Sequence, residues 1–155
     1  MKNKQIRRKI LSNQLDVISL IGKKTAYGAE CKFFKMSNNS RFGIKAYFSI
    51  EEAESSWRMQ KKAAKMGIGP KVGKLLIIKH RDNKNEDSEF IFGYETQVAE
   101  AVKGEYKNKI WKDQNKYLEE KLIRINCCDD FFPHNCGIIN GKLVLVDFGA
   151  YSTFY

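Results

Sequence analysis

Three oxygen-bearing side chains in the last third of the sequence have the types and spacing that magnesium-dependent phosphoryl transfer requires. Asp130 is followed five positions later by Asn135, and Asp147 stands in an Asp-Phe-Gly triplet after a short apolar run. Magnesium prefers oxygen ligands, so Asn135 and Asp147 could hold the ions that neutralise phosphate charge. One remaining carboxylate, that of Asp130, could orient the attacking hydroxyl.

A β-hairpin must position these residues. An Asn-Gly pair at 140–141 separates two apolar runs, and this is a strong local signal for a hairpin. With strands at 136–139 and 143–146, Asn135 and Asp147 are expected at the same end of the pair. The alternative is an ordinary hairpin whose acidic turn has no chemical role.

The segment resembles the catalytic core of the protein-kinase-like superfamily, in which Asp-x4-Asn forms the catalytic loop and Asp-Phe-Gly binds metal. The resemblance implies that Asp130 is catalytic, that Asn135 and Asp147 are metal ligands, and that ATP and Mg²⁺ are the cofactors. The Gly-Ile-x-Pro-x-Val run at 67–72 is similar to a turn of aminoglycoside-phosphotransferase-like and other atypical kinases.

Lys45 lies between apolar neighbours in an expected strand at 42–48, and burying an unpaired ammonium is costly. The run Gly-Ile-Lys-Ala-Tyr resembles the kinase strand whose lysine holds the α- and β-phosphates. A glutamate of the following helix orients that lysine in kinases. Glu54 is the favoured candidate, Glu51 and Glu52 remain open, and an outward-facing lysine is the plainer alternative.

Gly22 and Gly28 flank a turn between expected strands at 15–21 and 29–36, with Tyr27 beside the second glycine. Glycines let backbone amides approach phosphate oxygens. The stretch resembles a kinase glycine-rich loop, although the middle glycine is missing. It implies nucleotide contacts for both glycines and for Tyr27, whereas an ordinary hairpin is the alternative.

The later expected strands, at 75–79 and 90–98, lead into a kinase-like hinge near residues 97–100. There the resemblance implies that the backbone of Gln97, Val98 and Ala99 meets the adenine edge.

These elements predict an α+β, protein-kinase-like fold. Its N-lobe, about residues 13–99, would hold a five-stranded antiparallel sheet and a helix at 49–66, where Ser49 and Glu52 form a capping-box pattern. The reduced C-lobe, 100–155, would hold one long helix at 106–125 and the catalytic hairpin. The chain of 155 residues is expected to form this one minimal domain.

Composition narrows the partners without choosing among them. The formal net charge of +10 suits polyanions such as a nucleotide, a nucleic acid or an acidic protein face. No apolar run reaches the ~18 residues that span a bilayer, and no signal-peptide pattern follows the basic start of the chain. The sequence therefore predicts a protein of the bacterial or host-cell cytosol with no membrane partner.

The cysteine pattern does not favour a metal centre. A zinc site would need side chains whose spacing differs from the usual paired Cys-x2-Cys ligands. Small residues packed around the catalytic loop are the expected role of this set, which comprises Cys127, Cys128, His134 and Cys136.

Six residues follow Gly149, whereas ordinary protein kinases continue with an activation segment and further helices. The resemblance therefore implies a minimal kinase-like enzyme, truncated soon after Asp-Phe-Gly, that phosphorylates a protein Ser or Thr and depends on a protein partner. One alternative is a kinase-fold binding module that inhibits a partner. Another is a basic nucleic-acid-binding protein, for which the basic segment 2–12 could serve as an arm.

Overall fold

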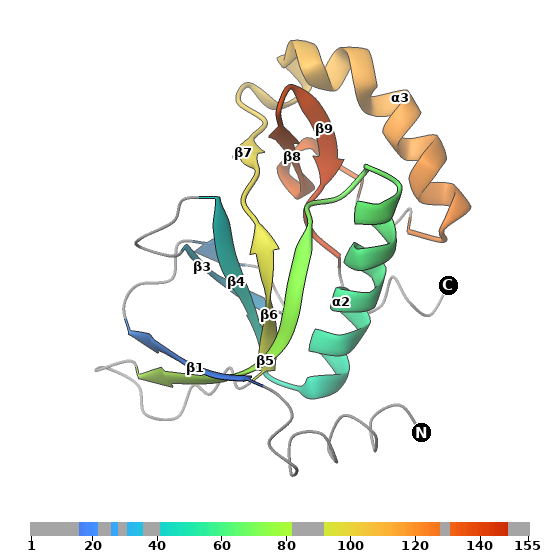
Figure 1. Cartoon of the computed structure of the whole chain (residues 1–155). Helices are drawn as coiled ribbons and strands as arrows, with labels where there is room; N and C mark the ends of the chain where they lie inside the picture. Colours follow the sequence, from blue (N-terminus) through green and yellow to red (C-terminus); the bar gives the residue numbers. More distant parts are fainter. Residues whose placement is uncertain are drawn as a thin grey trace.

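The computed structural model describes residues 16–21, 26–27, 31–35, 41–81, 92–127 and 131–148, which form an α+β arrangement of two sheets (Figure 1). The larger sheet has the strand order β1-β5-β6-β4-β3-β2. Its strands are β1 Asp16–Ile21, β2 Ala26–Tyr27, β3 Cys31–Lys35, β4 Phe42–Tyr47, β5 Val72–Arg81 and β6 Phe92–Gln97. Helix α2, Ile50–Lys65, packs against β4, β5 and β6.

The smaller sheet has the strand order β7-β8-β9, and the second helix lies beside it (Figure 1). The chain enters it directly after β6, and α3 packs along β9. Its elements are β7 Glu100–Ala101, η1 Glu105–Lys107, α3 Lys109–Arg124, η2 Pro133–Asn135, β8 Cys136–Ile139 and β9 Lys142–Leu145. In the part of the chain that the structure describes, neither α2 nor α3 is long and apolar enough to cross a membrane.

Local signals account for the ends of α2. The hydroxyl of Ser49 accepts a hydrogen bond from the Glu52 N–H at 3.2 Å, which satisfies one of the exposed amides of the first turn. The helix ends at Met66, and Gly67 follows with a φ of +74°, a conformation that glycine adopts without steric cost. Both predicted ends are therefore confirmed.

The predicted sheet is wrong in strand count and in the place of its first strand. Six strands are described rather than five, and β1 pairs parallel to β5 instead of antiparallel to β3. The edge of β3 is occupied by the short strand β2, with Ala26 opposite Phe33. β1 lies at the opposite edge of the sheet, so β1 and β3, which were predicted to be neighbours, are not paired.

The long helix predicted at 106–125 is shorter in the structure and begins after a separate turn. Asn108 interrupts it, because its side-chain oxygen accepts hydrogen bonds from the N–H groups of Ile110 and Trp111 at 2.9 and 3.1 Å. Residues before Asn108 form η1 instead.

The predicted hairpin is confirmed and is held on both sides. Asn140 and Gly141 have φ values of 51° and 76°, as a two-residue hairpin turn with positive φ requires. On one side, Gln114 of α3 donates to the Gly141 carbonyl and accepts from the Leu143 N–H. On the other side, the Leu145 N–H donates to the Ile68 carbonyl of the turn after α2, at 3.0 Å.

The main core lies where α3, the hairpin and the turn after α2 meet. Its buried side chains include Trp111, Leu118 and Leu122 of α3 together with Leu143 and Leu145 of β9. The same cluster contains Ala63, Ile68, Val102, Ile125, Cys127, Cys136 and Phe148. This core fixes the hairpin, and therefore the residues at its ends, against both helices.

Replacing the cap residue of α2 should destabilise the protein measurably. Ser49→Ala removes the acceptor for the Glu52 N–H and is expected to lower the free energy of unfolding by about 1 kcal/mol. Urea denaturation followed by circular dichroism would measure it. Ser55→Ala, inside the same helix, is the control and should change stability by less than about 0.5 kcal/mol. Equal effects of the two substitutions would contradict a capping role.

Candidate functional site

Lys45 carries a charge into the interior of the protein. It lies in the middle of β4, between Phe33 of β3 and Tyr94 of β6, and only 8% of it is exposed. Its Nζ donates to Gln60 Oε1 at 2.8 Å and to the carbonyl of Val146. A buried ammonium is tolerated only when such partners replace water, so these contacts fix where the lysine head must lie.

Two aromatic rings complete this environment. The Nζ of Lys45 lies 5.8 Å from the ring centroid of Tyr94 and 5.4 Å from that of Phe148. The negative face of an aromatic ring attracts a cation at such distances. Phe148 is itself buried in the main core, so the lysine is enclosed from the hairpin side as well as from the sheet.

The expected pairing of Lys45 with Glu54 is not the arrangement found. Glu54 is buried, but its Oε1 accepts from Arg58 Nε at 2.6 Å, one turn along the same helix. Gln60 takes the place beside Lys45 because it lies six residues further along α2, which is ~9 Å along a helix axis. Glu51 lies further still from Gln60 along the helix, in its first turn.

Asn135 and Asp147 are brought together as predicted. The carbonyl of Asn135 accepts from the N–H groups of Val146 and Asp147 at 2.9 and 3.2 Å. The carboxylate of Asp147 is exposed, although Phe148 beside it is buried. Lys45 also binds the carbonyl of Val146, so contacts from Lys45 and from Asn135 both end on the segment Val146–Asp147. We call Lys45, Asn135 and Asp147 the ionic group.

Other predicted site residues lie outside the part of the chain that the structure describes. Asp130, Gly22 and Gly28 are among them, and their predicted roles stay predictions. Tyr27 is described through its backbone only, where it pairs with Lys32.

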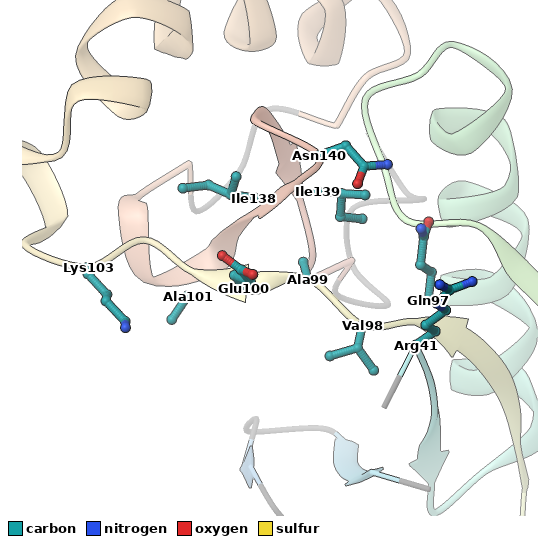
Figure 2. Close-up of a pocket in the computed structure, with 10 residues that line it drawn as sticks. All are labelled: Arg41, Gln97, Val98, Ala99, Glu100, Ala101, Lys103, Ile138, Ile139 and Asn140. Atoms are coloured by element: carbon teal, nitrogen blue, oxygen red, sulfur yellow. The ribbon is translucent and has the colours of Figure 1, made fainter. Parts of the chain in front are cut away.

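The residues predicted to form a hinge line a pocket, which we call the hinge pocket. Gln97, Val98 and Ala99 lie on the wall of a pocket of about 910 Å³ between the end of β6, β7 and the tip of the hairpin (Figure 2). The remaining lining residues are Arg41, Glu100, Ala101, Lys103, Ile138, Ile139 and Asn140. Backbone bonds hold this wall, because the Gln97 N–H donates to Lys71 O and the Val98 N–H to Arg41 O, each at 2.8 Å.

The pocket and the ionic group are separate along the hairpin. Asn140 at the hairpin tip lines the pocket, whereas Asn135 and Asp147 lie at the opposite end of the two strands. The four residues of β8 between them span ~13 Å. None of Lys45, Asn135 and Asp147 is among the residues that line the pocket.

The described residues offer two side chains with the oxygen donors that magnesium prefers. They contain no group of three or more His, Cys, Asp or Glu side chains able to hold an ion. Asn135 and Asp147 provide an amide and a carboxylate oxygen, and magnesium commonly uses one or two protein ligands with phosphates and water. The donor set therefore fits magnesium, and Asp130 could add to it from outside the described ranges.

The zinc alternative gains no support from the described side chains. Cys127 and Cys136 are buried in the main core. His134 is exposed and its ring stacks on that of Phe132, with centroids 5.5 Å apart. Cys127 and Cys136 act as small apolar side chains, as expected.

Sequence reasoning missed Gln60 as a functional residue. It had a signal, because Gln60 falls on the same helix face as Ala53, which is buried in the structure. A polar side chain on a buried face must find hydrogen-bond partners. No signal in the sequence pointed to Arg41 and Lys103 as lining residues of the hinge pocket.

No family model matches this sequence, and a comparison with functionally characterised proteins gives no match either.

Burial makes the thiol of Cys136 unreactive in the folded protein. Loss of water raises its pKa from 9.0 to about 12, so the thiol stays protonated at pH 8. Iodoacetamide at pH 8 should label Cys136 at least ~100-fold more slowly in the folded protein than in guanidinium. Peptide mass spectrometry against time would measure both rates. Equal rates would show that the site is not buried as described.

The same raised pKa predicts a dependence of stability on pH. Because the folded-state pKa lies above the unfolded one, this contribution is fully present below pH ~9 and is lost as pH rises toward ~12. Cys136→Ala should show a smaller loss of melting temperature over that range than the wild type.

Close packing between the hairpin and the hinge can be tested at Gly137. A Cβ at this position would lie 2.5 Å from the Cβ of Ala99 and 3.1 Å from both the Glu100 carbonyl and Val146 Cγ1. Gly137→Ala should therefore lower the free energy of unfolding by about 1–3 kcal/mol. The double variant with Ala99→Gly removes the nearest contact and should recover part of this loss in a double-mutant cycle. Additive effects would argue against the contact.

Proposed function

We propose that the chain is an ATP- and magnesium-dependent phosphotransferase of the minimal protein-kinase-like type. It transfers the γ-phosphoryl group to a hydroxyl, and a Ser or Thr of a protein is the proposed acceptor. The observation that carries the proposal is the convergence of Lys45 on the segment Val146–Asp147, to which Asn135 is also bonded. The ammonium of Lys45, from the early sheet, therefore meets the backbone of the segment that carries Asn135 and Asp147 around Val146.

Each residue of the ionic group has a part in this reaction. Lys45 would bind the α- and β-phosphates, and Asn135 and Asp147 would hold magnesium, which neutralises phosphate charge. Asp130 would accept or orient the proton of the acceptor hydroxyl as its oxygen attacks the γ-phosphorus. The bond from the γ-phosphorus to the bridging oxygen then breaks and ADP leaves. Positioning and charge neutralisation supply most of the catalysis in such a reaction.

The hinge pocket supports a nucleotide rather than a simple phosphate as ligand. Its wall at Gln97, Val98 and Ala99 belongs to the segment expected to meet an adenine edge, and Ile138 and Ile139 add apolar surface. The pocket and the ionic group are joined by the short strand β8. A nucleotide has the same division, with a flat base at one end and polyanionic phosphates at the other.

A second candidate is a binding module with this fold that does not transfer phosphate. The observation in its favour is the enclosure of Lys45 by Gln60, the Val146 carbonyl and Phe148. Because only 8% of Lys45 is exposed, a nucleotide can reach the remaining N–H of its ammonium only if the segment around Val146 shifts. A requirement for an activating protein partner follows naturally from the same contact, because a partner could shift this segment.

Nucleotide binding and transfer should both depend on the ionic group. With millimolar Mg-ATP, we expect a thermal shift in the wild type that is lost in Lys45→Ala. With radiolabelled ATP and a protein acceptor mixture, Asp147→Asn should lower transfer by about 100-fold or more, since charge stabilisation in the transition state is lost.

Matched controls are available on the exposed face of α3. Lys112→Ala and Asp113→Asn change the same kinds of charge far from the site and should leave binding and transfer unchanged.

The outcomes separate the candidate functions. Label that appears equally in the wild type and Asp147→Asn would refute the proposal that the protein is an enzyme. Binding without transfer would favour the binding module, and the lack of any shift would refute the nucleotide site. Binding to nucleic acid that weakens steeply with salt and is unchanged by Lys45→Ala would favour the third candidate, a basic nucleic-acid-binding protein.

A further inference from the structure

Gln60 is the centre of a buried polar network. It is fully buried (0% exposed) on α2 and makes four hydrogen bonds to other elements. Its Oε1 accepts from Lys45 Nζ and from the Tyr94 hydroxyl, each at 2.8 Å. Its Nε2 donates to the Pro70 carbonyl at 3.1 Å and to Thr96 Oγ1 at 2.7 Å. Every hydrogen-bonding capacity of the amide is thus used by the fold.

The orientation of this amide is fixed by its partners. The Pro70 carbonyl can only accept a hydrogen bond, and the Thr96 hydroxyl donates its own proton to Gln97 O. The NH₂ group must therefore face these two, and the oxygen must face Lys45. A chain of hydroxyl groups supports the same orientation, since Tyr47 donates to Ser56, which contacts the Tyr94 hydroxyl that donates to Gln60.

A glutamate would not fit this environment. One of its two oxygens would face the Pro70 carbonyl, so two acceptors would meet without a proton between them. The fold therefore selects a neutral side chain beside Lys45. The nearby buried carboxylate, Glu54, is already paired with Arg58. Among the described residues, no carboxylate lies within ion-pair distance of Lys45 Nζ.

We infer that Gln60 is a positioning residue that holds Lys45 through a neutral amide and leaves its positive charge for an anionic ligand. An ammonium has three N–H donors, and Gln60 and the Val146 carbonyl take two of them. The ligand class is a polyphosphate, and affinity should rise with its charge. The inference rests on the proposed function, because it assigns the origin of phosphate affinity within the same site.

The substitution Gln60→Glu tests the inference because it places a negative charge beside Lys45 in a side chain of nearly the same volume, while also opposing an oxygen to the Pro70 carbonyl. A carboxylate at this position would neutralise Lys45, so we expect binding of tripolyphosphate and of Mg-ATP to weaken on the order of 10- to 100-fold. Isothermal titration calorimetry on the full chain would measure both ligands. The wild type should also discriminate more strongly than Gln60→Glu between tripolyphosphate and inorganic phosphate.

Two further variants separate charge from structure. Gln114→Glu is the matched control, since Gln114 is also an amide with one backbone donor and one backbone acceptor, at Leu143 and Gly141. It should lower the melting temperature without weakening polyphosphate binding. Gln60→Met removes the hydrogen bonds but adds no charge. Its affinity for polyphosphate should stay within a few-fold of that of the wild type, while the rate of transfer falls. The loss should therefore appear in kcat rather than in KM, a pattern that a purely structural role would not produce.

The outcomes distinguish this inference from the function on which it rests. If the wild type binds polyphosphate and Gln60→Glu binds as tightly or more tightly, the neutral-amide inference is overturned and the proposed function stands. If the wild type binds neither tripolyphosphate nor Mg-ATP, the proposed function fails, and the inference fails with it. Should Gln60→Glu not fold, the affinity and kcat of Gln60→Met decide, and an unchanged kcat would overturn the inference.

Discussion

The buried ammonium group of Lys45 ties the two halves of the structure together. It extends from the six-stranded sheet, is held by Gln60 of α2, and reaches the backbone of Val146 at the end of the hairpin. Burying a charge is costly unless several partners replace its hydration. Because these partners come from three different elements, the position of the hairpin relative to the sheet and α2 is constrained by this one side chain, together with the backbone bond from Leu145 to Ile68.

The same constraint gives the candidate site its form. Phe148 is anchored in the core, so its neighbour Asp147 turns its carboxylate to solvent beside the carbonyl that Lys45 binds. The hairpin tip, at the far end, closes one wall of the hinge pocket. A lysine that has no carboxylate partner among the described residues, an exposed carboxylate and a pocket are the features a magnesium-bound nucleotide would use. The proposed phosphotransferase is the function that draws on all three.

Several features could be predicted from sequence because they depend on neighbours in the chain. Ser49 and Gly67 set the ends of α2 through a side-chain cap and a positive φ, and both act within a few residues. The turn at Asn140 and Gly141 likewise fixes the hairpin, which brings Asn135 and Asp147 together. Thus the relative position of two of the three residues of the ionic group was determined locally, by a turn type and the strand register that follows from it.

Tertiary structure decided the rest, since those choices depend on contacts between distant segments. An apolar strand such as β1 can pair at either edge of a sheet, and in the structure it pairs with β5 while β2 pairs with β3. In the same way, the charge of the acidic residues at the start of α2 made them the expected partners of Lys45. In the structure Lys45 instead donates to Gln60, and Glu54 accepts from Arg58. The residue types that could do the chemistry, the ends of α2 and the turn at Asn140–Gly141 could all be read from local sequence. Only packing determined which of them meet, because distance in space is set by the sum of long-range contacts rather than by spacing along the chain.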